Sequence, residues 1–245
     1  MRKLFAVLFI AALFCAVSSA QTVTGAHSTV QVADLTLVDW SAGQPWTTIL
    51  GHPNRANPNS VLIKLSEQKE LLFSVSLECG LYTQTLVKSS GGTKDTSSAQ
   101  ATVQVRVLVD GNSGTPALAF PGAVTFCERF QQLSAKLQGI IENLACFVDN
   151  DNDATTPPVF DPDAPGCILT AEEIELVLRT LNANAFFFIL PDVGVGTHNI
   201  EVQARIATLG SAQLGSWDAK ALIGKGTVVV ENHRLAKGDN IVLQP

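Results

Sequence analysis

The chain has 245 residues, of which 46% are hydrophobic and 16% charged, and its net charge is −6. This hydrophobic content argues against a disordered chain, and the length suits one large domain or two small ones. The excess of acidic residues argues against nucleic-acid binding, because that affinity depends on clustered Lys and Arg.

The first twenty residues have the pattern of a secretory signal peptide. Arg2 and Lys3 precede the apolar run Leu4–Val17, and the small residues Ser18 and Ala20 suit cleavage before Gln21. The run has 14 residues, fewer than the ~20 needed to span a bilayer. We therefore expect a secreted, surface-bound or periplasmic protein with no membrane span after cleavage; an uncleaved N-terminal anchor is the alternative. Loss of two cations leaves 14 basic against 22 acidic residues, a mature charge of −8.

Period-two alternation of apolar and polar residues predicts β-strands through most of the mature chain. The clearest examples are 71–79, 103–109 and 200–206, in which every second residue is apolar. The run 186–190 is apolar on both faces, which indicates a central or covered strand. Further strands are expected at 29–38, 46–50, 60–65, 81–87, 122–127, 211–223 and 226–234.

These strands, separated by Gly-, Ser- and Asp-rich turns, predict an all-β fold. We expect a two-sheet antiparallel β-sandwich of jelly-roll or immunoglobulin-like type. Residues 21–245 would form a single domain, elaborated by an acidic insert at about 139–183.

Two segments favour helix over strand. Thr170 to Glu173 matches a capping box, and the apolar residues at 174, 177, 178 and 181 follow at helical spacing, so one short helix is expected in the insert. The stretch 130–144 fits both periods, and we expect a strand up to Lys136 followed by a short helix or turn.

Four cysteines remain after signal cleavage: Cys79, Cys127, Cys146 and Cys167. An even number in an exported protein favours two disulfides, for which three connectivities exist. We prefer Cys146–Cys167, which brackets a loop-like segment, with Cys79–Cys127, which joins two strand-like segments. A zinc site is disfavoured, because no pair has CxxC spacing and no histidine lies near any of them.

An Asp-rich segment in the insert is the candidate metal site. Carboxylates at alternating positions can converge on Ca²⁺, which takes 6–8 oxygen ligands. The segment resembles the calcium loops of EF-hand, dockerin and thrombospondin type 3 repeats, but Ala154 and Phe160 stand where an EF-hand has Gly and Glu. The resemblance implies Asp149, Asp151 and Asp153 as ligands. Asp161 and Asp163 are additional candidates, and a solvated acidic loop without metal is the alternative.

The charge is concentrated in this insert. Nine acidic residues and no cation lie between Lys136 and Arg179, so a mature charge of −8 leaves +1 for the remainder of the chain.

The sequence assigns no catalytic residue. No GxSxG, HExxH, Walker or dinucleotide-binding motif is present. Residues 111–114 resemble the Gly-Asp-Ser-Gly of trypsin-like proteases, with Asn in place of Asp, and a β-turn explains them better. The strand-borne glutamates Glu78, Glu128 and Glu201 could form a glycosidase pair only if the fold brings two together. A sugar-binding platform would need Trp40, Trp46, Trp217 and Tyr82 to gather.

The sequence is therefore compatible with three functions. The first is a secreted, non-enzymatic surface, matrix or binding module, stabilised by Ca²⁺ and bound to an extracellular polymer. The second is a subunit of an extracellular filament or coat, in which residues 21–31 pair with the open sheet edge of a neighbour. The third is an extracellular hydrolase with no recognisable motif.

Overall fold

A computed structural model describes residues 28–33, 45–52, 54, 56–57, 59–110, 115–149 and 157–234. Within these ranges every regular element is a β-strand except one 3₁₀ turn, η1 (Leu144–Cys146), and all strand pairing is antiparallel. The prediction of an all-β antiparallel fold is confirmed. The expected signal peptide lies outside the described residues, and no helix among the described residues is long and apolar enough to cross a membrane.

The first large sheet has the strand order β1-β14-β4-β12. Its strands are β1 (Ser28–Ala33), β4 (Lys69–Ser89), β12 (Glu172–Val193) and β14 (Ser216–His233). β4 unites the two strands expected at 71–79 and 81–87, and it pairs with β12 along almost its whole length. β12 is an edge strand of this sheet, although its apolar run had indicated a central or covered position.

The second sheet has the order β2-β13-β5-β6, with β3 also paired to β13 and β7 to β5. Its strands are β2 (Thr47–Leu50), β3 (Val61–Leu65), β5 (Lys94–Val109), β6 (Ala117–Leu118), β7 (Val124–Lys136) and β13 (Gly196–Ala212). β4 turns into β5 through Gly91 and Gly92, both at positive φ. Glycine adopts this conformation without a steric penalty, which permits the tight turn between the sheets.

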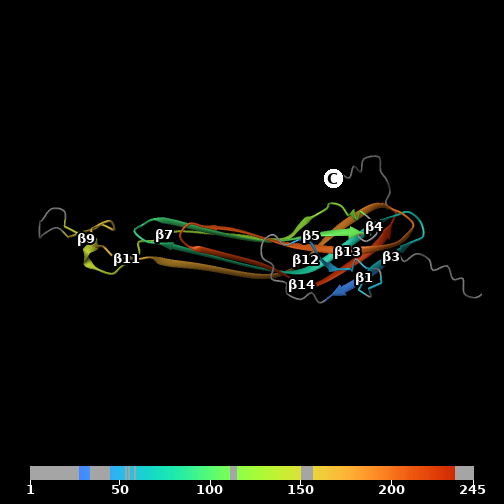
Figure 1. Ribbon diagram of the computed structural model, residues 1–245, viewed down its shortest axis with the longest axis horizontal. Coiled ribbons are helices and arrows are strands. Elements are labelled where there is room, and N and C mark those ends of the chain that lie inside the picture. Colours follow the sequence, from blue (N-terminus) through green and yellow to red (C-terminus); the bar gives the residue numbers. More distant parts are fainter. Residues whose placement is uncertain are drawn as a thin grey trace, which may run out of the picture.

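The molecule is elongated, with three regions along its long axis (Figure 1). The body contains the short strands β1, β2 and β3 together with the adjoining ends of the long strands. The shaft consists of the far halves of β4, β5, β7, β12, β13 and β14. The tip, made of the described residues 137–149 and 157–171, lies at the opposite end from the body.

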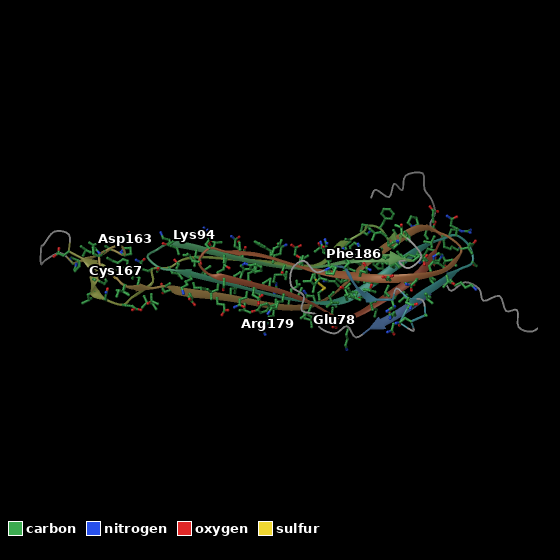
Figure 2. All side chains as sticks on the ribbon, in the orientation of Figure 1. Glu78, Lys94, Asp163, Cys167, Arg179 and Phe186 are labelled. Atoms are coloured by element: carbon green, nitrogen blue, oxygen red, sulfur yellow. A yellow bond between two sulfur atoms is a disulfide. The ribbon has the colours of Figure 1, made fainter. Side chains whose placement is uncertain are left out.

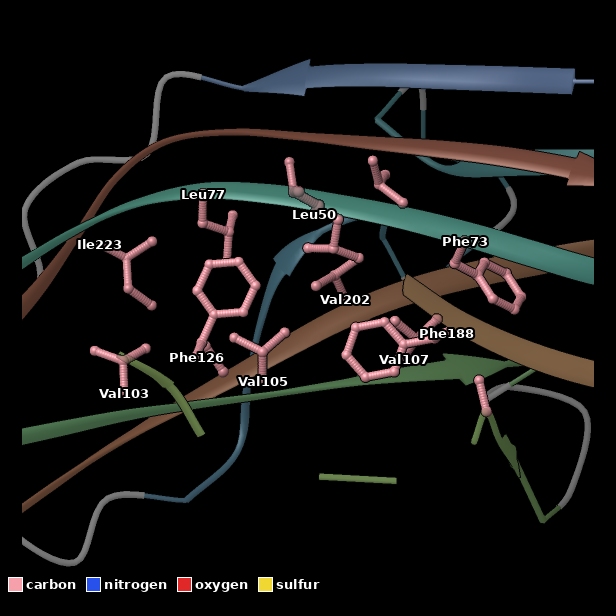
Figure 3. Packing of buried hydrophobic residues seen from close by; sticks show 14 of the residues in the cluster. Leu50, Phe73, Leu77, Val103, Val105, Val107, Phe126, Phe188, Val202 and Ile223 are labelled. Carbon is pink, nitrogen blue, oxygen red and sulfur yellow. The ribbon is translucent and has the colours of Figure 1, made fainter. Parts of the chain in front are cut away.

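The hydrophobic core lies in the body, where the two sheets face each other. Phe73 and Leu77 of β4 meet Val105 and Val107 of β5 between the sheets (Figure 3). All four are inward members of the alternating runs seen in the sequence, and all are buried. The Cys79–Cys127 disulfide joins β4 to β7 at the shaft end of this core, and Cys146–Cys167 closes the tip. Both are the pairs preferred from the sequence.

The interior of the shaft contains buried polar side chains among small and apolar ones. The side chain of Gln131 on β7 accepts a hydrogen bond from Thr83 (2.6 Å) and donates to Thr85 (2.7 Å) and to the Leu176 carbonyl (2.7 Å). One side chain thus joins β7 to both β4 and β12. Because each of these polar groups has a partner, they can lie between the two sheets without the cost of an unsatisfied hydrogen bond.

Asp95 organises the shaft near the tip. Its buried carboxylate accepts backbone N–H bonds from Lys88 (2.7 Å), Thr96 (2.8 Å) and Leu214 (3.0 Å), which link the β4–β5 turn to the β13–β14 turn. Burial by itself raises the pKa of this carboxyl, but the backbone N–H donors outweigh burial and hold the pKa below its usual range.

The helix expected after Thr170 is wrong. Residues 172–183 form the first half of β12 and pair in register with 78–89 of β4. Ile174, Leu176 and Leu178 also alternate, so the segment satisfies a strand period, and the long exposed edge of β4 supplies a partner for it. In the other ambiguous segment the strand up to Lys136 is confirmed, but the residues after it include the short strand β8 (Ile140–Ile141), and η1 begins only at Leu144.

Candidate functional site: the tip and the outer face of the shaft

The tip is a small, covalently closed unit of two short ladders. β8 (Ile140–Ile141) pairs with β11 (Leu169–Thr170), and β9 (Phe147–Val148) pairs with β10 (Val159–Phe160). Between the ladders, the Asn143 side chain donates to the Gly166 carbonyl (2.8 Å) and accepts from the Ile168 N–H (3.3 Å), beside the Cys146–Cys167 disulfide. A disulfide and the hydrogen bonds of one side-chain amide therefore fix a segment with little apolar interior.

The structure describes three of the five predicted calcium ligands. Asp149 follows β9, whereas Asp161 sits opposite Cys146, where its N–H bonds the Cys146 carbonyl (2.8 Å). Asp149 and Asp161 are thus three residues apart along the ladder, a separation of about 10 Å at ~3.3 Å per residue. Asp163 lies beside Asp161, whose carboxylate accepts its N–H (3.0 Å). Asp151 and Asp153 lie outside the described residues, and no cluster of three potential metal ligands occurs within the described ranges.

Apolar side chains are exposed on both ladders of the tip. Leu144 is 84% exposed, and Ile140, Val159 and Ile168 are also exposed. An isolated exposed apolar residue is ordinary on a protein surface, but a group of them on one small, rigid unit is typical of an interaction site. Figure 2 shows this unit, marked by Asp163 and Cys167, at the free end of the shaft.

A shallow groove of about 710 Å³ lies on the outer face of the shaft, across β12, β4 and β14. Its floor is Gly80, between Leu181 on β12 and Leu222 on β14 in the same cross-strand row. A Cβ atom at position 80 would lie 2.5 Å from Cγ of Leu222, so only glycine lets this leucine lie across the strand. The sequence contained a sign of this close contact, because a glycine inside a strand often marks a place where a neighbouring group approaches the backbone closely.

Cations border this groove at one end. In the next row, Tyr82 stands between Arg179 and Lys220, whose charged groups lie 5.5 and 5.7 Å from its ring centre. Cations near an aromatic face are attracted by the ring quadrupole. An apolar floor beside two cations is chemically suited to an apolar group that carries an acidic substituent.

The aromatic residues considered for a sugar platform do not gather. Trp46 stacks on Arg106 (4.4 Å) and Arg205 (4.9 Å) of the second sheet, whereas Tyr82 lies on the outer face of the first. Burial lowers the pKa of Arg106, and the neighbouring Arg205 lowers it further. Trp217 packs over Gly210, and Trp40 is outside the described residues.

The polar residues considered for catalysis are likewise distributed over the molecule. Glu201 is buried on β13 and bonds Thr48 (3.2 Å), while Glu78 borders the outer groove and Glu128 pairs with Gln100. His198 contacts Asp110 (2.5 Å) and the Gly194 carbonyl (2.8 Å) at the far end of the body. The Gly-Asn-Ser-Gly segment beside Asp110 lies outside the described residues.

Comparisons with known proteins give no relative: no family model, no curated protein and no solved structure matches the chain. Conclusions about function therefore depend on the chain's own chemistry. The two disulfides indicate an oxidising compartment, which is consistent with an extracellular location.

Proposed function

We propose that the protein is a secreted, non-enzymatic surface or matrix module that presents its tip to an extracellular polymer. The observation that carries this proposal is the continuous pairing of β4 with β12 from Leu190 in the body to Glu172 at the base of the tip. The 22 residues of β12 correspond to a length of about 70 Å at ~3.3 Å per residue. Such a ribbon holds a small rigid unit away from the body.

The exposed apolar residues of the tip support the same proposal. A surface that stays apolar on a disulfide-closed unit is suited to contact a partner, since burial contributes about 25 cal/mol per Å² of apolar area. The signal peptide expected from residues 1–20 supports secretion. The jelly-roll or immunoglobulin-like type of sandwich stays a prediction.

The test is cosedimentation of the mature protein with insoluble cellulose, chitin and peptidoglycan. We expect binding to at least one polymer, and loss of binding when residues 142–168 are replaced by an Asn-Gly turn that joins β8 to β11. Leu144→Ser should weaken binding, while Leu209→Ser, an equally simple change at an exposed leucine of the shaft, should not. Equal binding by the protein without its tip, or turnover of a polymer, would overturn the proposal.

Calcium stabilisation of the tip belongs to the same proposal. The register supports a site built from Asp149, Asp151 and Asp153 rather than from all five carboxylates, because Asp161 is held opposite Cys146. Extracellular modules bind Ca²⁺ at ~10⁻⁴–10⁻³ M, so a site with few ligands would be filled outside a cell.

A filament or coat subunit is the second candidate, favoured by the position of β1. Residues 28–33, at the start of the mature chain, form an edge strand on β14 of the same chain. The same pairing supplied by a neighbour would join copies into a filament. Deletion of residues 21–31 should then abolish assembly at high concentration, whereas assembly that survives the deletion would exclude strand exchange.

A further inference from the structure

β12 carries unusual chemistry for an edge strand. Natural sheets protect their edges with Lys, Pro, bulges or short strands. From Ile174 to Leu190, β12 contains neither Lys nor Pro, and Glu175 and Arg179 are its only charged residues. Apolar side chains on both faces of this strand are 37–64% exposed: Ile174, Leu176, Val177, Leu178, Leu181, Phe186 and Phe187.

Among the described residues, the backbone of this edge has no strand partner over the shaft. At Ile189 both the N–H and the carbonyl bond Phe120, across the edge opposite β4. Backbone groups alternate sides along a strand, so the odd-numbered residues from 173 to 187 direct their N–H and C=O groups to this edge. No strand in the described part of the chain pairs with them. Figure 2 shows Arg179 at the outer margin of the shaft, with its side chain directed outward.

We propose that this edge binds a second copy of the chain, by antiparallel pairing of β12 with β12 about a two-fold axis at Val177. The inference goes beyond the proposed function of the tip and does not depend on it. In this register Glu175 of each copy lies opposite Arg179 of the other, and Leu176 lies opposite Leu178. The dimer would have a continuous sheet across both shafts, with exposed leucines paired on the inner face.

Charge selects this register over its neighbours. Centring the axis on residue 179 or 175 would place Arg against Arg or Glu against Glu, and like charges directly opposite are destabilising. Centring it on Leu176 would pair Glu173 with Arg179, but Glu173 already forms an ion pair with Lys88 (2.9 Å). Glu175 instead accepts a hydrogen bond from the neutral amide of Gln84, so it gains a cationic partner only in the Val177 register.

Charge reversal tests the register directly, with sedimentation velocity of the mature protein as the readout. We expect a concentration-dependent dimer. Glu175→Arg and Arg179→Glu should each weaken dimerisation at least about tenfold, because each places like charges opposite one another twice. An equimolar mixture of the two single variants should form a heterodimer, since every facing pair is then of opposite charge. The double variant should recover the homodimer.

Two further variants separate this effect from damage to the fold. Lys220→Glu removes the other cation beside Tyr82 and lies on β14, away from the edge, so it should leave the dimer intact. Val177→Pro removes an N–H from the open edge only, and should abolish dimerisation while the thermal transition is retained. Monomeric wild-type protein at 100 μM, single variants that dimerise like the wild type, or a dimer lost only on deleting residues 21–31 would each overturn the proposal.

Discussion

The body and the shaft are built from the same strands but with different interiors. The inward side chains of β4 change from uniformly apolar residues at 71–77 to a mixed set toward the tip, in which Thr83, Thr85 and Ser89 alternate with Leu81 and Val87. On β5 the valines of the body give way to Ala99, Ser97 and Asp95. Alternation alone is therefore enough to form a strand, while side-chain size and chemistry decide whether the two sheets enclose an apolar core or a thin layer that includes polar side chains.

This difference implies two modes of stabilisation. The body depends on apolar burial, whose loss leaves cavities, whereas the shaft depends on hydrogen bonds made by a few buried polar groups. Four experiments test this difference between the body and the rest of the molecule.

Adjacent phenylalanines at the body end of β12 compare a core position with a surface position, and so test how strongly the body depends on apolar burial. Phe188 is 1% exposed and Phe187 is 63% exposed. Phe188→Ala should lower the free energy of unfolding by about 4 kcal/mol, because it removes a ring from the core. Phe187→Ala, the matched control, should cost less than about 1 kcal/mol in urea denaturation. Similar losses for both would contradict the placement of the core.

Asp95→Ala should lower the free energy of unfolding by about 3 kcal/mol, since three backbone N–H groups lose a charged acceptor. Because the folded pKa of Asp95 is lowered, its stabilisation is complete above the unfolded pKa of about 3.9 and is lost as pH falls through the folded value.

Urea titrations between pH 2 and pH 6 should therefore show a weaker acid dependence in Asp95→Ala than in the wild type. Asp218→Ala removes a half-exposed carboxylate that pairs with Lys220 (3.2 Å), and it serves as the control. An unchanged acid limb in Asp95→Ala would show that this carboxylate does not link the turns.

Gln131→Leu should cost about 2 kcal/mol, because Thr83, Thr85 and the Leu176 carbonyl would lose their shared partner at nearly constant volume. Amide exchange should accelerate in the shaft more than in the body. Gln132→Leu changes the exposed neighbour and should leave exchange unaltered. Equal acceleration of amide exchange in the shaft and the body would show that the two regions unfold as one unit.

Calcium should produce the smallest effect, confined to the tip. At 5 mM Ca²⁺ and a Kd of ~1 mM, the gain is about 1 kcal/mol, or about 3 °C in Tm. Asp149→Ala with Asp151→Ala should abolish this rise, while Asp161→Ala with Asp163→Ala should preserve it, because the ladder holds those two residues apart from Asp149. No calorimetric heat at millimolar Ca²⁺ would exclude the site.

The sequence by itself determined the all-β character of the chain and the strands around 71–79, 103–109 and 200–206, because alternation is a local signal. It favoured one of three possible cysteine pairings, and the structure selected that one. The tertiary structure decided the rest. The segment after Thr170 satisfies both a helical and a strand period, and pairing with the far half of β4 selects the strand. The apolar run of β12 likewise suited a covered strand, and only the sheet order shows that it forms an edge. The outer groove and the Asp95 connection join residues distant in the chain, and such contacts leave no local pattern in the sequence.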